Sequence, residues 1–231
     1  MLNVQHLCTR YEGKYLLEDI SFCLDFGQVL YLLGGNGAGK SSLALSLAGD
    51  PKLQVTGSVQ YQATPSTPAV NLLELKPETR AQAGVYLAFQ YPPELPGVSI
   101  AQFLHFAHSA SLQPTLPFGA FLEDILLPAT KLLNLSWEFV GRFMHQGLSG
   151  GEQKRLLLLE MLVLKPKLLI LDELDSGLDS AGLKLMVKTY HWLRSDNPDL
   201  SLVVITHQKS LLKLIPPHQK LQLLDGEIVV P

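Results

Sequence analysis

The sequence has few cysteines, no excess of basic residues and no long apolar run, and each shortage excludes a class of protein. Only Cys8 and Cys23 are present among 231 residues, too few for a disulfide framework and without the CxxC spacing of a metal or cluster scaffold. We expect both to be buried structural thiols. The net charge of -3 is unlike that of a nucleic-acid binder, so nucleic acid is not an expected partner.

The longest apolar run, Leu156 to Leu164, is interrupted by Glu160 and is much shorter than the 18 or more residues typical of a membrane span. The first residues, MLNVQHLCTRYEG, resemble neither a secretory signal nor a transit segment. We therefore expect a cytoplasmic protein that does not insert into a membrane. A hydrophobic fraction of 47% excludes a disordered chain, and the length suffices for one domain with a substantial core.

A glycine-rich segment follows a short apolar run and precedes a helical pattern. Its sequence, GGNGAGKS, has the spacing G-x-x-x-x-G-K-[ST] of a phosphate-binding loop, in which backbone N–H groups converge on phosphate oxygens. Residues 29–33 predict the buried strand before it, and residues 41–48 predict the helix after it. The expected nucleotide-binding residues are Gly34, Gly35, Asn36, Gly37, Ala38, Gly39, Lys40, Ser41 and Ser42.

Two side chains of this loop have specific expected roles. Lys40 would bring a positive charge to the terminal phosphates and assist catalysis, and Ser41 would offer its hydroxyl to the magnesium that accompanies ATP. The phosphates would lie at a helix N-terminus, which favours negative charge. On this motif alone, a glycine-rich turn that opens an ordinary helix remains the alternative.

Two further apolar runs end in polar residues. Residues 168–172 predict a buried strand, and Asp172 at its end would hold magnesium through a water molecule. Glu173 follows, and repulsion between the adjacent carboxylates suits it to polarise the attacking water. Residues 202–206 predict another strand, after which His207 would contact the terminal phosphate. Solvated charge and a structural histidine are the alternatives.

Residues 84–90 predict a strand that ends at Gln90, where three prolines in the next six residues should stop regular structure. Gln90 would be a metal or water ligand on a movable hinge, or else an amide that caps the strand. The pattern is helical from 98 to 165. Within it, small residues before an apolar helix indicate a second anion-binding helix N-terminus, formed by Ser149, Gly150 and Gly151.

The fold class expected is α/β, with a mostly parallel core sheet, an N-terminal antiparallel β layer and an inserted helical subdomain. We expect a single domain over 1–231, with a catalytic core of 1–90 and 166–231 and a helical subdomain of 91–165. Smaller elements are expected as a strand over 56–61, a surface loop over 62–71, a helix over 181–194 and a hairpin with an Asp-Gly turn after 221. Tyr11 would stack on adenine or be an exposed turn residue.

The stretches GGNGAGKSS, LSGGEQKR, LLILDE, SGLD and THQ, together with Gln90, occur in the order and spacing of an ABC-type ATPase, and the resemblance covers nearly the whole chain. It implies a P-loop NTPase that hydrolyses ATP with Mg²⁺ and forms a nucleotide-sandwich homodimer. In such a dimer Ser149, Gly150 and Gly151 of one subunit close over the ATP held by Lys40 of the other. Asp179 would lie at the subunit interface.

Three stretches, GVYLAFQYPPELPGVS, GLSGGEQKR and LDELDSGLD, resemble the SufC family, the soluble ATPases of SUF iron-sulfur cluster assembly. This resemblance implies the scaffold proteins SufB and SufD as partners. Gly35 and Leu156 to Leu159 depart from the family pattern, at a usual proline and a more polar stretch. The alternatives are the nucleotide-binding subunit of a membrane transporter and a nucleotide-gated structural protein, and Glu173 and His207 disfavour the latter.

Overall fold

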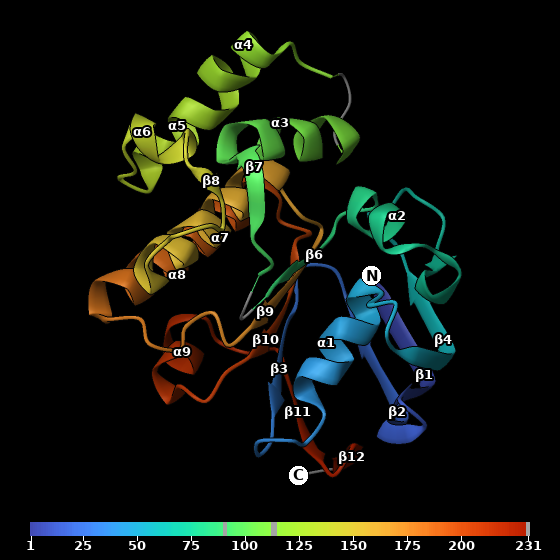
Figure 1. Cartoon of the computed structure of the whole chain (residues 1–231). Helices are drawn as coiled ribbons and strands as arrows, with labels where there is room; N and C mark the ends of the chain where they lie inside the picture. The colour runs from blue at the N-terminus through green and yellow to red at the C-terminus, as the bar shows by residue number, and fades with distance from the viewer. Residues whose placement is uncertain (90–91, 112–114, 230–231) are drawn as a thin grey trace. The chain divides into compact units, whose positions relative to one another are not determined.

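The computed structural model describes residues 1–89, 92–111 and 115–229, and the chain divides into two compact units (Figure 1). The first unit comprises Met1–Phe89, Pro166–Ser176 and Arg194–Pro231, and the second comprises Gln90–Lys165 and Gly177–Leu193. The sequence-based boundaries of the catalytic core and the helical subdomain stay a prediction.

An antiparallel sheet forms one layer of the first unit, with the strand order β2-β1-β4-β5. The strands are β1 (Leu2–Tyr11), β2 (Lys14–Leu24), β4 (Gln54–Tyr61) and β5 (Val70–Asn71). Buried and exposed residues alternate along β1 and β2, as expected for a sheet with one buried face, and the alternation shifts where His6 and Asp19 have positive φ. The predicted N-terminal antiparallel layer is confirmed.

A six-stranded sheet forms the second layer, in the order β12-β11-β3-β10-β9-β6 among the residues described. Neighbours are parallel except for the β11–β12 hairpin, which turns at Asp225 and Gly226. The strands are β3 (Val29–Leu33), β6 (Val85–Ala88), β9 (Leu168–Asp172), β10 (Ser201–Ile205), β11 (Gln219–Leu224) and β12 (Glu227–Val229). The central strands are apolar and buried almost throughout, as is typical of a parallel sheet. The mostly parallel core sheet is also confirmed.

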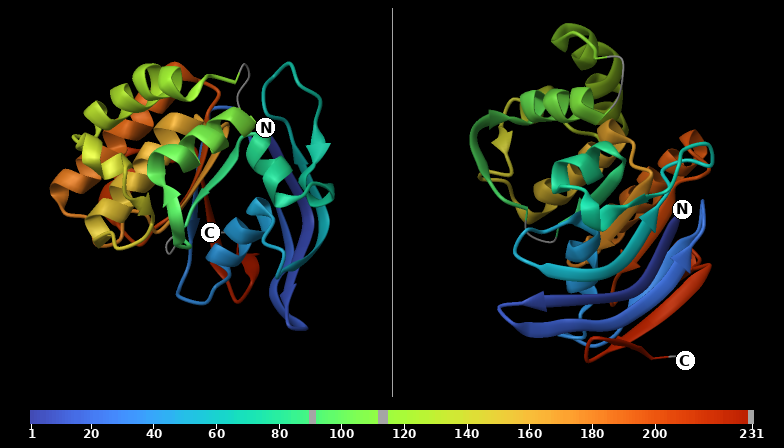
Figure 2. Two further views of the ribbon diagram at one scale, coloured as in Figure 1. Left: turned by 45° about the horizontal axis from the view of Figure 1, so that its top comes forward. Right: turned by 90° about the vertical axis from the view of Figure 1, so that its right-hand side faces the viewer.

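Helix α1 (Lys40–Ala48) lies between the two sheets of the first unit (Figure 2) and contacts β6, β9, β1 and β2. Its residues Leu43, Ala44 and Leu47 are buried in a core cluster that draws side chains from both sheets. The unit also contains a 3₁₀ turn (Leu72–Glu74), α2 (Pro77–Gln82) and α9 (Lys209–Leu214). The phosphate-binding loop, which leads into α1, therefore begins and ends in well-packed structure.

The second unit is mainly helical. It contains α3 (Ile100–Ser111), α4 (Phe118–Phe121), a π-helical turn (Leu122–Leu126), α5 (Leu127–Leu132), α6 (Trp137–Val140), α7 (Gly150–Leu164) and most of α8 (Ser180–Asp196). Two short strands, β7 (Leu95–Ser99) and β8 (Phe143–Met144), pair antiparallel. The predicted stop of regular structure was therefore wrong for 95–97, because Pro96 and Gly97 are tolerated in a two-stranded ribbon whose register is irregular.

Both cysteines are free, but neither is buried. Cys23 is exposed on β2, where its thiol lies 3.4 Å from Asn3 Oδ1, and Cys8 is half-buried. The expected burial was wrong because the thiol of Cys23 falls on the outward face of the alternating strand. None of the described helices could span a bilayer, by length and apolar character together.

Candidate functional site

The phosphate-binding loop joins β3 to α1, as the sequence predicted. Gly34, Gly37 and Gly39 have φ of 147°, 79° and 100°, backbone conformations that other residues rarely adopt. A Cβ on Gly39 would come within 2.6 Å of Leu17 Cδ2, and one on Gly34 within 2.4 Å of the Leu223 carbonyl oxygen. The loop is therefore tightly packed on its inner side. A Cβ on Gly35 or Gly37 would meet nothing within 4 Å, so the outer side is open.

The ammonium group of Lys40 lies inside this loop. Its Nζ donates hydrogen bonds to the carbonyl oxygens of Gly34 and Gly35 at 3.0 and 2.7 Å, and the residue is only 6% exposed. Gly39 caps the helix in the left-handed conformation, so the first N–H groups of α1 are oriented toward the loop. A buried cation beside helix N–H groups is a site suited to phosphate oxygens.

Ser41, in the first turn of α1, meets Asp172 at the end of β9. Its hydroxyl donates to Asp172 Oδ1 at 3.2 Å. Burial raises the pKa of Asp172, while the hydrogen bond from Ser41 opposes that rise. A hydroxyl and a carboxylate are hard oxygen donors, so this pair fits Mg²⁺. The third expected ligand, Gln90, lies outside the described residues. Among the residues that the structure describes, no three or more acidic, histidine or cysteine side chains gather into a possible metal site.

Glu173 and His207 follow β9 and β10, which are neighbours in the parallel sheet. Glu173 Oε1 lies 3.3 Å from His207 Nε2, and the two side chains are 25% and 51% exposed. Glu173 has a φ of +53°, an uncommon conformation for this residue type, and its N–H donates to the Ile205 carbonyl oxygen at 3.0 Å. The sequence predicted that both would lie at this edge, and the structure brings them together.

Three residues that were not predicted surround this pair. Asp175 is 3% exposed, and its carboxylate accepts a hydrogen bond from the Thr206 hydroxyl. Thr206 Oγ1 accepts from the Gln208 N–H at 2.8 Å, and Gln208 Nε2 donates to the Asp175 carbonyl oxygen at 2.8 Å. The two residues that flank His207 are thus tied to the loop that carries Glu173. The sequence gives no sign of this connection, because the neighbours of Asp175 in the chain do not indicate that its carboxylate is buried.

In the second unit, Ser149 caps α7. Its Oγ accepts from the Glu152 N–H at 3.4 Å, and Glu152 Oε2 accepts from the Ser149 N–H at 2.8 Å, which completes a capping box. Arg142 donates to Glu152 Oε1 at 2.5 Å. Chiefly through the hydrogen bond from the Ser149 N–H, the pKa of Glu152 falls from 4.5 to about 2. The start of this helix is therefore fixed by side chains that the LSGGE sequence itself supplies.

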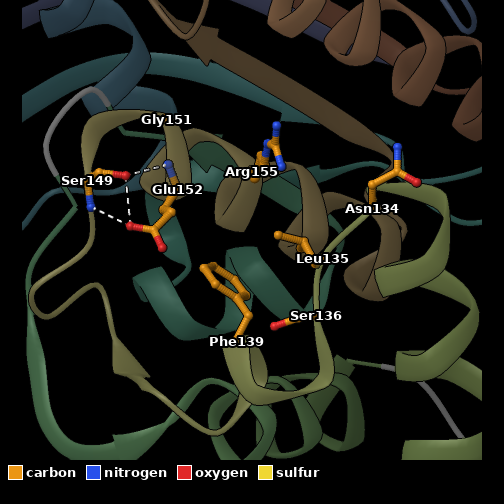
Figure 3. Close-up of a pocket in the computed structure, with 8 residues that line it drawn as sticks. All are labelled: Asn134, Leu135, Ser136, Phe139, Ser149, Gly151, Glu152 and Arg155. Carbon is orange, nitrogen blue, oxygen red and sulfur yellow. Dashed lines mark hydrogen bonds between the residues drawn. The ribbon is translucent and has the colours of Figure 1, made fainter.

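Gly150 and Gly151 form the first turn of α7 and have no structural need to be glycine. A Cβ on either would meet nothing within 4 Å, and neither has a positive φ. Their first turn borders a cavity of about 410 Å³ within the second unit (Figure 3). The cavity is lined by Asn134, Leu135, Ser136, Phe139, Ser149, Gly151, Glu152 and Arg155. Both glycines are exposed, so no side chain covers the backbone of this turn.

Two other candidate residues have simpler surroundings. Tyr11 is 41% exposed at the end of β1, so its contact with adenine stays a prediction. Asp179 accepts a hydrogen bond from the Gly182 N–H at 2.7 Å, at the start of α8. Its place at a subunit interface also stays a prediction.

Comparison with known proteins supports the class to which these motifs point. A protein-family model described as "ABC transporter" matches residues 17–176. A "Probable ATP-dependent transporter" of Synechocystis sp. is 36% identical and covers 100% of this chain and 88% of its own. A "Probable ABC transporter ATP-binding protein" of Streptococcus pyogenes is 35% identical, with the same coverage of both chains.

Solved structures share the fold. The dimeric post-hydrolysis structure of an ATP-binding cassette bound to ADP and Pi has a TM-score of 0.81 at 19% identity and covers 100% of this chain and 97% of its own. An ATP-binding subunit of an ABC transporter has a TM-score of 0.80 at 22% identity, with 100% and 88% covered. The chain belongs to the ABC transporter family, as one of its ATP-binding cassettes. It is an ATPase with the α/β fold of that family.

Proposed function

We propose that this ATPase drives conformational change in a SufB/SufD scaffold during iron-sulfur cluster assembly. The loop after β9 carries this proposal: it reads DSGLD, as in the SufC family, and its first acid, Asp175, is buried against Thr206 and Gln208. In this loop a resemblance in sequence thus coincides with a specific set of contacts. The stretches GVYLAFQYPPELPGVS and GLSGGEQKR give further support.

In the proposed site, Lys40 and the loop N–H groups bind the β- and γ-phosphates of ATP. Ser41 and Asp172 would hold Mg²⁺, with Gln90 as a further ligand, and the ion would neutralise phosphate charge when bound. Glu173 takes a proton from the attacking water molecule while the oxygen of that water forms a bond to the γ-phosphorus. The bond to the β–γ bridging oxygen breaks, which gives ADP and phosphate, and His207 contacts the departing phosphate.

The site is completed by a second copy of the chain. Ser149, Gly150 and Gly151 of one subunit would contact the ATP held by Lys40 of the other, and Asp179 would lie at the interface. The open space around Gly150 and Gly151 supports this arrangement, because no contact within the described part of the chain requires glycine there. ATP would bring two copies together, and release of phosphate would let them separate.

We further propose a catalytic core of 1–90 and 166–231 and a helical subdomain of 91–165.

The proposal is tested by capture of partners from the native cytosol. Tagged protein, with and without ATP, would be used as bait, and the co-purifying proteins would be identified by mass spectrometry. A tagged Lys40→Ala variant is the matched control, because its captured partners should no longer change with ATP. SufB and SufD in the eluate would support the assembly function.

The second candidate is the nucleotide-binding subunit of a membrane transporter. It is favoured by the names of the relatives, which are described as transporters or as transporter ATP-binding proteins. A membrane permease in detergent-solubilised eluates, without SufB or SufD, would overturn the assembly proposal in its favour. We also propose a cytoplasmic location, because the SufC family that the sequence resembles is soluble.

A further inference from the structure

A buried histidine and a buried glutamate meet near the segment that leads into Ser149. His145 follows β8 and is 4% exposed, and Glu160, near the middle of α7, is 6% exposed. His145 Nε2 lies 3.2 Å from Glu160 Oε1. Neither residue has a part in the ATP-binding or hydrolytic roles described above.

Burial makes this contact specific. A carboxylate removed from water is costly unless a donor or a positive charge faces it. The 3.2 Å approach of Glu160 Oε1 to Nε2 is a close polar contact without the geometry of a hydrogen bond. The other ring nitrogen of His145, Nδ1, is buried and has no hydrogen-bond partner among the described residues. His145 also has a φ of +59°, which is uncommon outside glycine. The contact with Glu160 therefore occurs at a bend that the backbone alone does not favour.

The same segment is held at a second point. Arg142 donates to the Gly147 carbonyl oxygen at 2.7 Å and to Glu152 Oε1 at 2.5 Å. Glu152 and Glu160 are eight residues apart on α7, or roughly 12 Å along its axis at 1.5 Å per residue. The segment 143–148 is thus fastened to α7 at two separate heights. Two such anchors fix both its position and its direction as it enters Ser149.

We propose that His145 and Glu160 are positioning residues for the signature loop, defined as Ser149–Gly151. They hold it in the orientation in which it contacts ATP bound to a second copy of the chain, and they touch no ATP themselves. This inference rests on the proposed composite site. It assigns the pair to the half of that site that acts on the partner's nucleotide, and not to the half that contains Lys40.

The first test separates the two halves. In His145→Ala, affinity for a fluorescent ATP analogue at low protein concentration should stay within about twofold of the wild type, while ATPase activity should fall about tenfold, the usual size of effect for loss of one buried polar contact. Glu160→Gln keeps the side-chain length and an oxygen that can face the imidazole, and it should retain activity within about threefold. His191→Ala, an exposed histidine of the same unit, is the matched control and should behave as the wild type.

Truncation of His145 alone leaves space beside a buried carboxylate and so endangers folding. The double variant His145→Leu with Glu160→Leu avoids this, because apolar side chains often replace a buried pair without loss of stability. Its melting temperature should stay close to that of the wild type, while its ATPase activity should fall as in His145→Ala. Wild-type activity in the folded double variant would overturn the proposal.

Mixing experiments distinguish positioning from a general defect. A mixture of the double variant with Lys40→Ala contains dimers in which one site has an intact Lys40 from one chain and an intact signature loop from the other. ATPase activity should therefore rise on mixing above the sum of the two variants measured separately, of which only the double variant retains about a tenth of the wild-type activity. If the mixture regains no activity while a mixture of Ser149→Ala with Lys40→Ala does, the positioning role is wrong. If neither mixture regains activity, the composite site of the proposed function is wrong.

Discussion

At the residue scale, Asp172 shows how the site is balanced between stability and function. Burial raises the pKa of this carboxyl, so its negative charge disfavours the folded state when no cation is bound. Below the ordinary pKa of about 3.9, both folded and unfolded chains hold the proton and the charge costs nothing. As the pH rises through the higher folded pKa, the folded chain alone must bury the charge, and stability falls.

Asp172→Asn should therefore stabilise the metal-free protein at pH 7, and the gain should vanish below about pH 4. Thermal unfolding in a chelator, followed from pH 3 to pH 8 for both chains, measures this. Magnesium with ATP should narrow the difference at pH 7 because it should stabilise the wild type more than the variant. A variant that is less stable than the wild type at pH 7 in chelator would contradict this account.

Gly150 presents a second conflict between stability and function. Because a Cβ at this position meets nothing and φ is not positive, Gly150→Ala should raise the free energy of unfolding by roughly 0.4–1 kcal/mol through the unfolded chain. The added methyl group would stand where the partner's phosphate is proposed to approach, so turnover should fall by about a hundredfold. Urea unfolding and phosphate release measure the two effects.

Gly119→Ala is the matched control for that substitution. Gly119 also lies in a helix, and a Cβ there meets nothing within 4 Å. It should gain similar stability with no loss of turnover. If Gly150→Ala keeps wild-type turnover, close approach of the ATP phosphate does not require glycine at this position.

At the element scale, the start of α7 depends on the charge of Glu152. Its pKa is lowered to about 2, first by the hydrogen bond from the Ser149 N–H, so the ionised form favours folding. That contribution is fully present above the ordinary pKa of 4.5 and is lost as the pH falls toward 2.

Glu152→Gln keeps the length of the side chain and removes the charge. It should lower the melting temperature at pH 7, and the difference from the wild type should shrink between pH 4.5 and pH 2. Circular dichroism melts across this range measure it. A difference that is the same at pH 2 and pH 7 would show that the charge has no part in the cap.

The elements that the sequence predicted best are those with a continuous pattern. The apolar strands β3, β9 and β10 and the glycine loop follow from local residue types, because burial on both faces demands apolar side chains throughout. The strands β7 and β8 were missed. Pro96 lies within β7, and proline normally argues against a strand, while β8 has only two residues. The contacts of Asp175 were also missed, because they join segments 31 residues apart through a carboxylate that sequence patterns place in solvent.

At the scale of the whole molecule, the proposed composite site ties activity to association. The residues proposed to bind phosphate and polarise water lie in the first unit, and the signature loop belongs to the second. If two copies form each site, specific ATPase activity should rise with protein concentration and approach a plateau once dimers dominate. Steady-state assays over a wide concentration range, with mass measured in parallel, test this. A constant specific activity from a proven monomer would exclude it.

The measurement that tests the central claim most directly is the mass of Glu173→Gln in solution with and without ATP. The substitution removes the group proposed to polarise water but leaves Lys40 and the signature loop intact, so ATP should bind and remain unhydrolysed. Sedimentation should then show a monomer without nucleotide and a stable dimer with ATP and magnesium, with turnover reduced at least about a hundredfold. A variant that stays monomeric at saturating ATP, or one that hydrolyses ATP at the wild-type rate, would contradict the account.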